Sequence, residues 1–294
     1  MNVKKHTTNR KKRVMKKRFR IAALIACFLG IGLIVFRYAE FVSKTIYEES
    51  VSHLTEVFHQ SDNMLSELTN KNLTYLHMWG KYLQHTSSED EIRDYIEKAQ
   101  EEAGFLSFFF LTVDGNYKTV TGETGYLGLQ ENFEEEIRQG QDVITNAVVP
   151  GKSQMLVFVS PESSGSYQGF DYDAIAIAYE NADIVNVLNI SAFNGNAKSY
   201  VVHPDGRVVI DHSFSSWGDV YNFFGLLREH SDLSEKEILA LSGKMKEGQT
   251  DAMLVKLDGK KYYLVYEKSK PQDWIFLGLV KADIVNAGMN TLQL

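Results

Sequence analysis

The chain has 294 residues, of which 44% are hydrophobic and 12% aromatic, and this composition is ample for a buried core and excludes a largely disordered protein. The net charge of −7 is unevenly spread: residues 1–20 hold ten basic residues and no acidic one, so the rest of the chain carries −17. Such an acidic body excludes nucleic-acid binding, which needs positive charge on the folded surface. The single cysteine, Cys27, excludes a disulfide framework.

An apolar segment follows the basic tail. From Ile21 to Phe36, sixteen residues carry no charge or strongly polar group, and Arg20 and Arg37 can extend from its two ends toward the membrane surface. We predict a transmembrane helix over residues 21–37. The alternative is a cleaved signal peptide, which needs small residues after the apolar segment, whereas the sequence there is the bulky RYAEFVSK.

The basic residues also predict the orientation of this span. Lysine and arginine beside a membrane helix remain in the cytoplasm. We therefore predict that residues 1–20 form a cytoplasmic tail, that residues 38–294 are extracytoplasmic, and that the protein lies in the cell membrane. Because Cys27 falls within the predicted span, the external part has no thiol, which suits a bacterial envelope.

The region 38–103 is predicted to be helical. Between Tyr38 and Trp79 there is neither proline nor glycine, which predicts one helix of about 60 Å. Apolar or small residues recur there at spacings of four and three, as in a coiled coil, at Tyr47, Val51, Leu54, Phe58, Ser61, Leu65 and Leu68. A second stripe consists of Ile46, Val57, Met64, Leu73, Tyr75 and Met78. The helix can pack along its own domain, pair with a second copy, or do both, and we predict a homodimer. A short amphipathic helix is expected from Glu91 to Ala103.

The remainder of the chain changes to a strand pattern. Aromatic and β-branched runs flank three Asp-Gly pairs, which favour tight hairpin turns, at 114–115, 205–206 and 258–259. The spacing of apolar residues between Phe214 and Gly248 predicts helix. Each half of this region therefore reads as two strands, one or more helices, and three strands.

An internal repeat supports two tandem modules. The sequence ADIVN occurs at residues 182–186 and again at 282–286, each time directly after an apolar strand. We predict modules over residues 104–196 and 197–294. Helices segregated to one side of antiparallel sheets make the fold class α+β.

A long helix emerging from the membrane and followed by two tandem PAS-like modules resembles the double Cache sensory domain of bacterial receptors. Three segments are similar to the input regions of clostridial hybrid sensor histidine kinases and diguanylate cyclases, namely YEESVSHLTE at 47–56, SAFN at 191–194 and Asp273-Trp274. The resemblance implies a small ligand in the first, membrane-distal module and a second transmembrane helix soon after the second module. The sequence ends at Leu294 before such a helix, so we expect an input region whose output part is absent.

The resemblance leaves the output open. We expect the sensing input of a sensor histidine kinase, with a membrane diguanylate cyclase and an anchored extracellular binding protein without output as alternatives. No nucleic-acid partner is expected. The ligand is expected to be a metabolite, such as an amino acid, a carboxylate or a nucleoside.

Candidate ligand-binding residues come from the first module. Tyr117, Thr119 and Thr121 alternate along a predicted strand, so one face presents an aromatic ring and two hydroxyls, which suits a small polar ligand. Tyr126 lies in the Gly-rich loop that follows, and Tyr179 lies on the last strand of the module. The alternative is that these residues form only the solvated face of an antiparallel sheet.

Other motifs carry less weight. Residues 151–153, GKS, resemble the end of a phosphate-binding loop, but Asn146 stands where that loop needs glycine. His203, Asp211 and His212 could meet across a hairpin as metal ligands, although a polar hairpin without a ligand is the simpler interpretation. We predict no catalytic residue, metal or cofactor in this chain.

Overall fold

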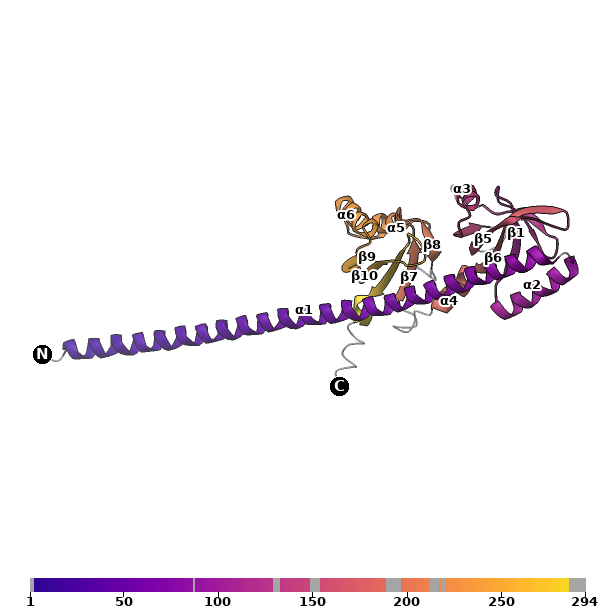
Figure 1. Cartoon of the computed structure of the whole chain (residues 1–294). Coiled ribbons are helices and arrows are strands. Elements are labelled where there is room, and N and C mark those ends of the chain that lie inside the picture. The colour runs from indigo at the N-terminus through magenta and orange to yellow at the C-terminus, as the bar shows by residue number, and fades with distance from the viewer. Residues whose placement is uncertain are drawn as a thin grey trace. The chain divides into compact units, whose positions relative to one another are not determined.

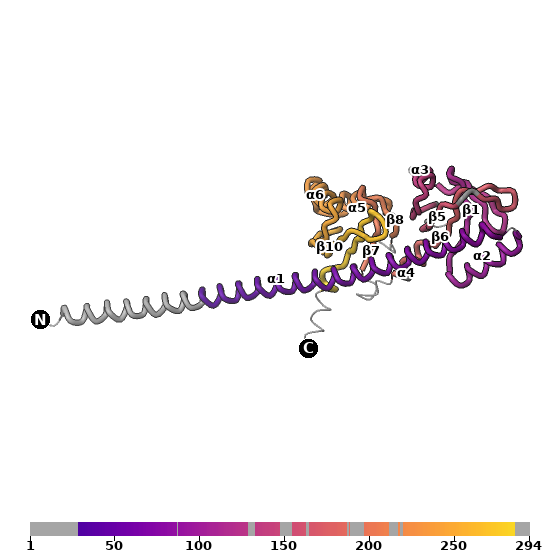
Figure 2. Tube along the Cα trace, in the orientation of Figure 1, coloured from indigo at the N-terminus to yellow at the C-terminus, as the bar shows by residue number. Residues whose placement is uncertain are grey.

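The structure is a computed structural model, and it describes the backbone of residues 3–86, 88–128, 133–148, 154–188, 197–211, 217 and 220–285. Within these ranges, side chains are described from residue 29 onward, except at 148, 154, 163, 164 and 187. The chain divides into two compact units, residues 1–50 and 51–294 (Figures 1 and 2). The first unit is helical from Val3, and the second contains all of the strands.

A single helix, α1 (Val3–His85), extends beyond both ends of the predicted 38–79 stretch. Among the residues whose side chains are described, no helix combines the length and the apolar character that a membrane crossing requires. Residues 21–28 of the predicted span lie outside that description. The transmembrane helix over 21–37 therefore stays a prediction.

The first module contains a six-stranded antiparallel sheet in the order β3-β2-β1-β6-β5-β4. Helix α2 (Glu89–Ala103) precedes it, begins at the Ser88 N-cap and ends at Gly104, whose φ of 73° is left-handed. The elements of the module are β1 (Ser107–Leu111), β2 (Asn116–Thr119), β3 (Thr124–Tyr126), α3 (Phe133–Arg138), β4 (Val143–Val148), β5 (Gln154–Tyr167), β6 (Phe170–Glu180) and α4 (Asn181–Leu188).

The second module contains a five-stranded antiparallel sheet in the order β8-β7-β11-β10-β9. Its elements are β7 (Ala197–Val202), β8 (Val208–Asp211), α5 (Phe223–His230), α6 (Glu235–Lys246), β9 (Asp251–Leu257), β10 (Lys260–Lys268) and β11 (Ile275–Lys281). The predicted α+β class with a long N-terminal helix is confirmed.

Local sequence chemistry explains the hairpins and the repeat. Gly115, Gly206 and Gly259 take φ values of 84°, 89° and 76° at the three Asp-Gly turns, a region that glycine enters without strain. The two ADIV segments are helical. Each follows the strand that comes last in the sequence of its module, β6 in the first and β11 in the second. Asn286 of the second copy lies outside the described residues.

One local prediction was wrong. Tyr126 does not lie in a loop: it ends β3, where it pairs with Asn116 and extends the sheet by one edge strand. The helical region expected from Phe214 to Gly248 is divided into α5 and α6, because Ser234 and Glu237 form a capping box that starts a new helix. Residues 212–216, 218 and 219 lie outside the description.

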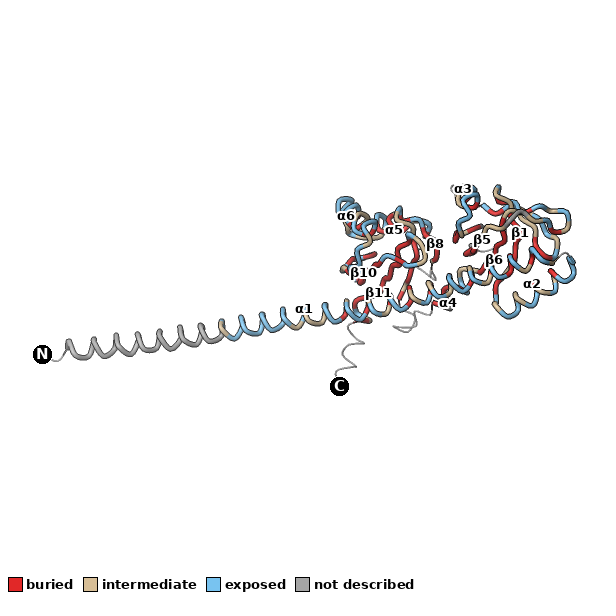
Figure 3. The backbone as a smooth tube through the Cα atoms, in the orientation of Figure 1, coloured by how far each residue is buried: buried red, intermediate tan, exposed pale blue. Residues whose placement is uncertain are grey.

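Within the second unit, α1 packs against one face of both sheets, and α3, α5 and α6 cover the opposite faces (Figure 1). Leu54, Phe58 and Leu65 of the predicted coiled-coil seam are at most 1% exposed in the single chain. Figure 3 shows the buried residues concentrated in the strands. The seam is therefore occupied by the domain of its own chain, because heptad spacing suits a helix that packs on a sheet as well as a helix pair.

A glycine notch marks the contact between α1 and the second sheet. Gly278 lies on the central strand β11, and a side chain there would collide with the ring of Phe58. The Phe58 ring also packs against Phe276, with ring centroids 6.1 Å apart. Only glycine lets the ring approach the strand backbone so closely.

Candidate functional site

The site begins with two residues of β2. Tyr117 pairs with Leu111 and Thr119 with Phe109 of β1, so both lie on the sheet face that α3 covers. The Tyr117 ring meets Phe109 edge-on at 4.8 Å between centroids and lies over the backbone of Gly125. Tyr117 is half-buried, so its ring is fixed by packing while part of it reaches the surface.

A short hydroxyl chain continues from Thr119. Its Oγ1 lies 2.9 Å from Thr121 Oγ1 and accepts the N–H of Glu123 at 3.0 Å. Thr119 is 8% exposed, whereas Thr121 is exposed in the turn that follows β2. The structure therefore brings Thr119 and Thr121 into contact and places Tyr117 on the same face of β2 as Thr119.

The floor of this face is formed by β6. Its residues toward α3 are Ala174, Ala176 and Ala178, all fully buried, whereas the opposite face of the same strand carries Ile175 and Ile177. These alanines belong to the same core cluster as Phe133 and Ile137 of α3. The exposed part of Tyr117 and the Thr119–Thr121 hydroxyl pair, at the edge of this core, are the groups that can contact a small amphipathic molecule.

Tyr126 lies apart from this group. It is 58% exposed on the edge strand β3, and its pairing with Asn116 puts it on the sheet face opposite Tyr117. The structure does not bring it to the hydroxyl chain.

Tyr179 also lies on the opposite face. Its hydroxyl donates to Asn72 Oδ1 of α1 at 3.0 Å, and the Ala103 carbonyl oxygen lies 3.4 Å away. Burial raises the pKa of Tyr179 to about 12. Its hydroxyl is therefore used to attach α1 and α2 to the sheet.

The described residues hold no group of three or more His, Cys, Asp or Glu side chains placed to bind a metal. His203 packs edge-on against Trp274 at 6.3 Å, and burial lowers its pKa. The described residues do not include His212 or residues 151–153, the segment that resembles the end of a phosphate-binding loop.

Sequence reasoning missed the alanine row of β6 and the polar contacts of α1. The row was visible in DAIAIAYE at 173–180, where alanine alternates with isoleucine. The contacts of His59 with Glu267 at 3.3 Å and of His77 with Asp142 at 2.9 Å join residues far apart in the chain, and no local signal in the sequence indicates them.

No known protein family and no curated protein matches this sequence. Solved structures do match. The ligand-binding domain of the Pseudomonas aeruginosa PAO1 amino acid chemoreceptor PctB, in complex with L-Arg, is 15% identical over 82% of this chain and 92% of its own, with a TM-score of 0.59. The extracellular domain of a protein named histidine kinase mmHK1S-Z3 is 15% identical over 85% and 99%, with a TM-score of 0.57. The chain has the fold of these two domains.

A third structure agrees with this assignment of the fold. The sensory domain of the Campylobacter jejuni chemoreceptor Tlp3, with isoleucine bound, is 11% identical over 83% of this chain and 97% of its own, with a TM-score of 0.52. Between 92% and 99% of each of the three matched domains is covered. The resemblance inferred from sequence is therefore confirmed as a resemblance of fold.

Proposed function

We propose that residues 38–294 are the extracytoplasmic, ligand-sensing input of a membrane-bound signal-transduction receptor. The observation that carries the proposal is that α1 packs on both sheets, on the face opposite the covering helices. A ligand bound on the α3 side of the first sheet would shift that sheet against the helix. A receptor responds to a ligand only through a difference in affinity between two states, and such a shift provides one.

The ligand is proposed to be a small amphipathic metabolite, with amino acids as the first class to test. Two of the matched chemoreceptor domains were solved with isoleucine and L-Arg. In this chain, the half-buried Tyr117 ring and the Thr119–Thr121 hydroxyl pair place an apolar surface beside hydrogen-bonding groups. The output is proposed to be a histidine kinase, as the name of one matched structure suggests, with a diguanylate cyclase as the alternative.

Thermal unfolding of the full chain in a neutral detergent, measured against a panel of amino acids, carboxylates and nucleosides, tests the proposal. A ligand that raises the unfolding temperature should lose its effect with Tyr117→Ala and with Thr119→Ala. Tyr221→Ala, which alters a 76% exposed tyrosine of the second module, is the matched control. A ligand effect that survives both substitutions would move the site away from β2.

The membrane topology is part of the same proposal. The apolar segment 21–37 anchors the chain, with residues 1–20 in the cytoplasm, because ten basic residues precede the segment. Protease added to intact spheroplasts should remove epitopes inserted after residue 100. Full protection of these epitopes would contradict the orientation.

A homodimer is proposed to pair through the α1 stripe that the sheets leave open. Met64 and Met78 are 39% and 49% exposed, and Leu68 and Tyr75 between them are half-buried. Their spacing of four, seven and three is that of a helix pair. Met64→Cys and Met78→Cys should form cross-links between chains in membranes, whereas Leu54→Cys, buried by its own chain, should not.

A further inference from the structure

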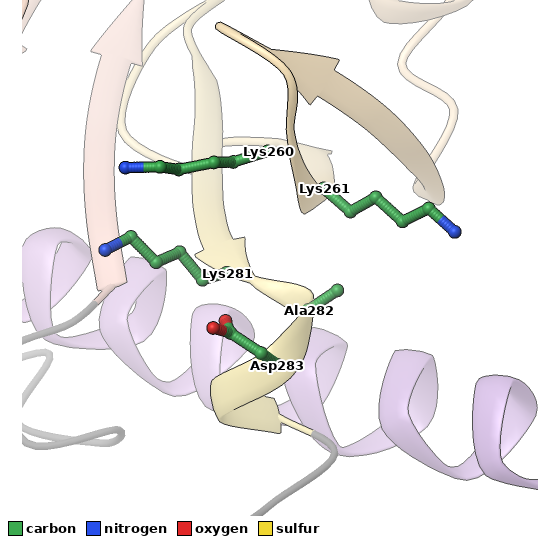
Figure 4. Close-up of a pocket in the computed structure, with 5 residues that line it drawn as sticks. All are labelled: Lys260, Lys261, Lys281, Ala282 and Asp283. Atoms are coloured by element: carbon green, nitrogen blue, oxygen red, sulfur yellow. The ribbon is translucent and has the colours of Figure 1, made fainter.

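A cavity of about 540 Å³ lies at one end of the second sheet, where β10 begins and β11 ends. Among the residues that the structure describes, five line it: Lys260, Lys261, Lys281, Ala282 and Asp283 (Figure 4). This volume exceeds that of a bare inorganic ion and falls within the range of pockets for small organic ligands. Three of the five lining residues are cations, although the chain outside its first twenty residues is strongly acidic.

Strand register brings the cations to one face. Lys281 pairs with Tyr262, so Lys260, two residues before Tyr262, lies on the same face as Lys281. Figure 4 shows the side chains of Lys260 and Lys281 extending in the same direction and Lys261 in the opposite one. Lys198 of β7 pairs with Leu279, which places it on the same face as Lys281.

None of these three lysines, Lys198, Lys260 and Lys281, forms an ion pair with a described residue. Other lysines of the module do: Lys244, Lys256 and Lys268 lie 3.3, 3.8 and 2.8 Å from the carboxylates of Asp251, Asp232 and Asp273. The positive charge at this end of the sheet is therefore not balanced by ion pairs as it is elsewhere in the module. Burial and the charge of Lys281 lower the pKa of Lys198, while Asp211 opposes this effect.

The nearby carboxylates have other partners. Asp283 Oδ1 accepts the N–H of Ile284 at 3.0 Å. Asp258 accepts Trp217 Nε1–H at 2.7 Å and lies 3.1 Å from His230 Nδ1. Asp211 Oδ2 accepts the N–H of Val220 at 3.4 Å. Each of these carboxylates thus has a donor of its own.

Aromatic residues flank the cation group. Lys198 Nζ lies 3.7 Å from the centre of the Trp217 ring, and this ring lies 5.9 Å from that of Tyr262. Tyr200 follows Lys198 by two residues on the same face of β7, is fully buried, and its hydroxyl has no hydrogen-bond partner among the described residues.

We propose that this cavity binds a phosphate group carried by a small organic body, with Lys260 and Lys281, which line it, as its cationic partners and Lys198 on the same sheet face as a further positive charge. Lysine ammonium groups bind phosphate as point charges and require no planar geometry. The same chemistry is offered by a soluble phosphate ester and by the headgroup of an anionic phospholipid. This second site lies in the other module from Tyr117 and Thr119 and does not depend on the proposed ligand there.

The test uses the full chain in neutral detergent at constant ionic strength, titrated calorimetrically with glycerol 3-phosphate. A parallel measurement compares the unfolding temperature in nanodiscs of phosphatidylcholine with that in nanodiscs of phosphatidylcholine and phosphatidylglycerol. The double variant Lys260→Gln/Lys281→Gln should weaken binding by about tenfold or more, as expected for the loss of two charge-assisted contacts. Lys236→Gln/Lys246→Gln, which removes the same charge from exposed positions on α6, is the matched control.

Binding of glycerol 3-phosphate that only the first double variant loses identifies a soluble phosphate ester as the ligand. A stabilisation that appears only with phosphatidylglycerol, and that the same variant abolishes, identifies the lipid headgroup. Lys260→Gln alone provides a milder variant if the double variant does not fold. Absence of both effects, or equal losses in the α6 control, overturns the proposal. Tyr117→Ala should leave this binding unchanged, which separates failure here from failure of the site in the first module.

Discussion

Helix α1 attaches to the two sheets by different chemistry. Against the first sheet, Trp79 packs on Phe105 and Phe108 with ring centroids 5.5 and 6.1 Å apart. Against the second, Asp62, only 1% exposed, accepts the Ser269 hydroxyl and the N–H of Lys270. Aromatic packing is largely non-directional, whereas buried carboxylates need fixed partners. The first attachment also includes the Tyr179–Asn72 hydrogen bond and the second the Phe58–Phe276 contact, so the two differ chiefly in the buried carboxylate that fixes α1 at the second sheet.

The largest effect is expected from the aromatic attachment. Trp79→Ala should lower the free energy of unfolding by about 3–5 kcal/mol, because it leaves a large cavity between α1 and the first sheet. Urea denaturation of the full chain in detergent measures the change. Tyr75→Ala, one turn earlier and half-buried, should cost clearly less. Equal losses would show that Trp79 is not central to this attachment.

The second-largest effect is expected at Gly278, where the Phe58 ring packs on the strand backbone. Gly278→Val should lower the free energy of unfolding by about 1–3 kcal/mol, because the new side chain collides with the Phe58 ring. Combining it with Phe58→Ala should cost less than the sum of the two single changes, since the collision is then absent. Strict additivity in this double-mutant cycle would show that the two residues do not interact.

The third prediction concerns the hydrogen bond from the Tyr179 hydroxyl to Asn72, which also joins α1 to the first sheet. Tyr179→Phe should lower the free energy of unfolding by about 1 kcal/mol, because Asn72 Oδ1 loses a buried donor. Tyr126→Phe, at the exposed edge of the same sheet, is the control and should change the stability by less than about 0.5 kcal/mol. Thermal unfolding of the two variants side by side gives the comparison.

The smallest effect concerns a buried carboxylate of the second attachment. Burial raises the pKa of Glu267, while His59 opposes the shift. The folded protein thus binds this proton more tightly than the unfolded chain, and stability is lost as the pH rises from the unfolded pKa through the folded one. Glu267→Gln should therefore increase the free energy of unfolding near pH 7 and leave it unchanged near pH 4, where the carboxyl group is protonated.

The pH dependence separates charge from packing. Glu67→Gln, an exposed glutamate of α1, is the matched control and should have no effect at either pH. A gain for Glu267→Gln that is the same at both pH values would mean that packing, and not ionisation, is responsible.

Local chemistry made part of the fold predictable. The Asp-Gly turns, the short amphipathic helix and the ADIVN repeat depend on neighbouring residues, so they could be read from the chain. The sequence could not show which face of a sheet a residue occupies, the one toward α1 or the one away from it. Tyr117 and Tyr179 both alternate along strands, but only the assembled sheet shows that one faces α3 and the other α1. The Asp62 and Lys198 environments likewise arise from segments distant in sequence, and no local pattern indicates them.

The notch at Gly278 limits how α1 can transmit a change. The Phe58 ring lies directly on the backbone of β11, in the space that a side chain at position 278 would fill. The next turn of the helix carries Ser61 and Asp62, and no aromatic ring. Axial sliding by one turn would remove the ring from its recess and separate Asp62 from its donors. Tilting about the recess keeps both contacts. We therefore expect α1 to behave as a lever with its fulcrum at the second sheet, and not as a piston.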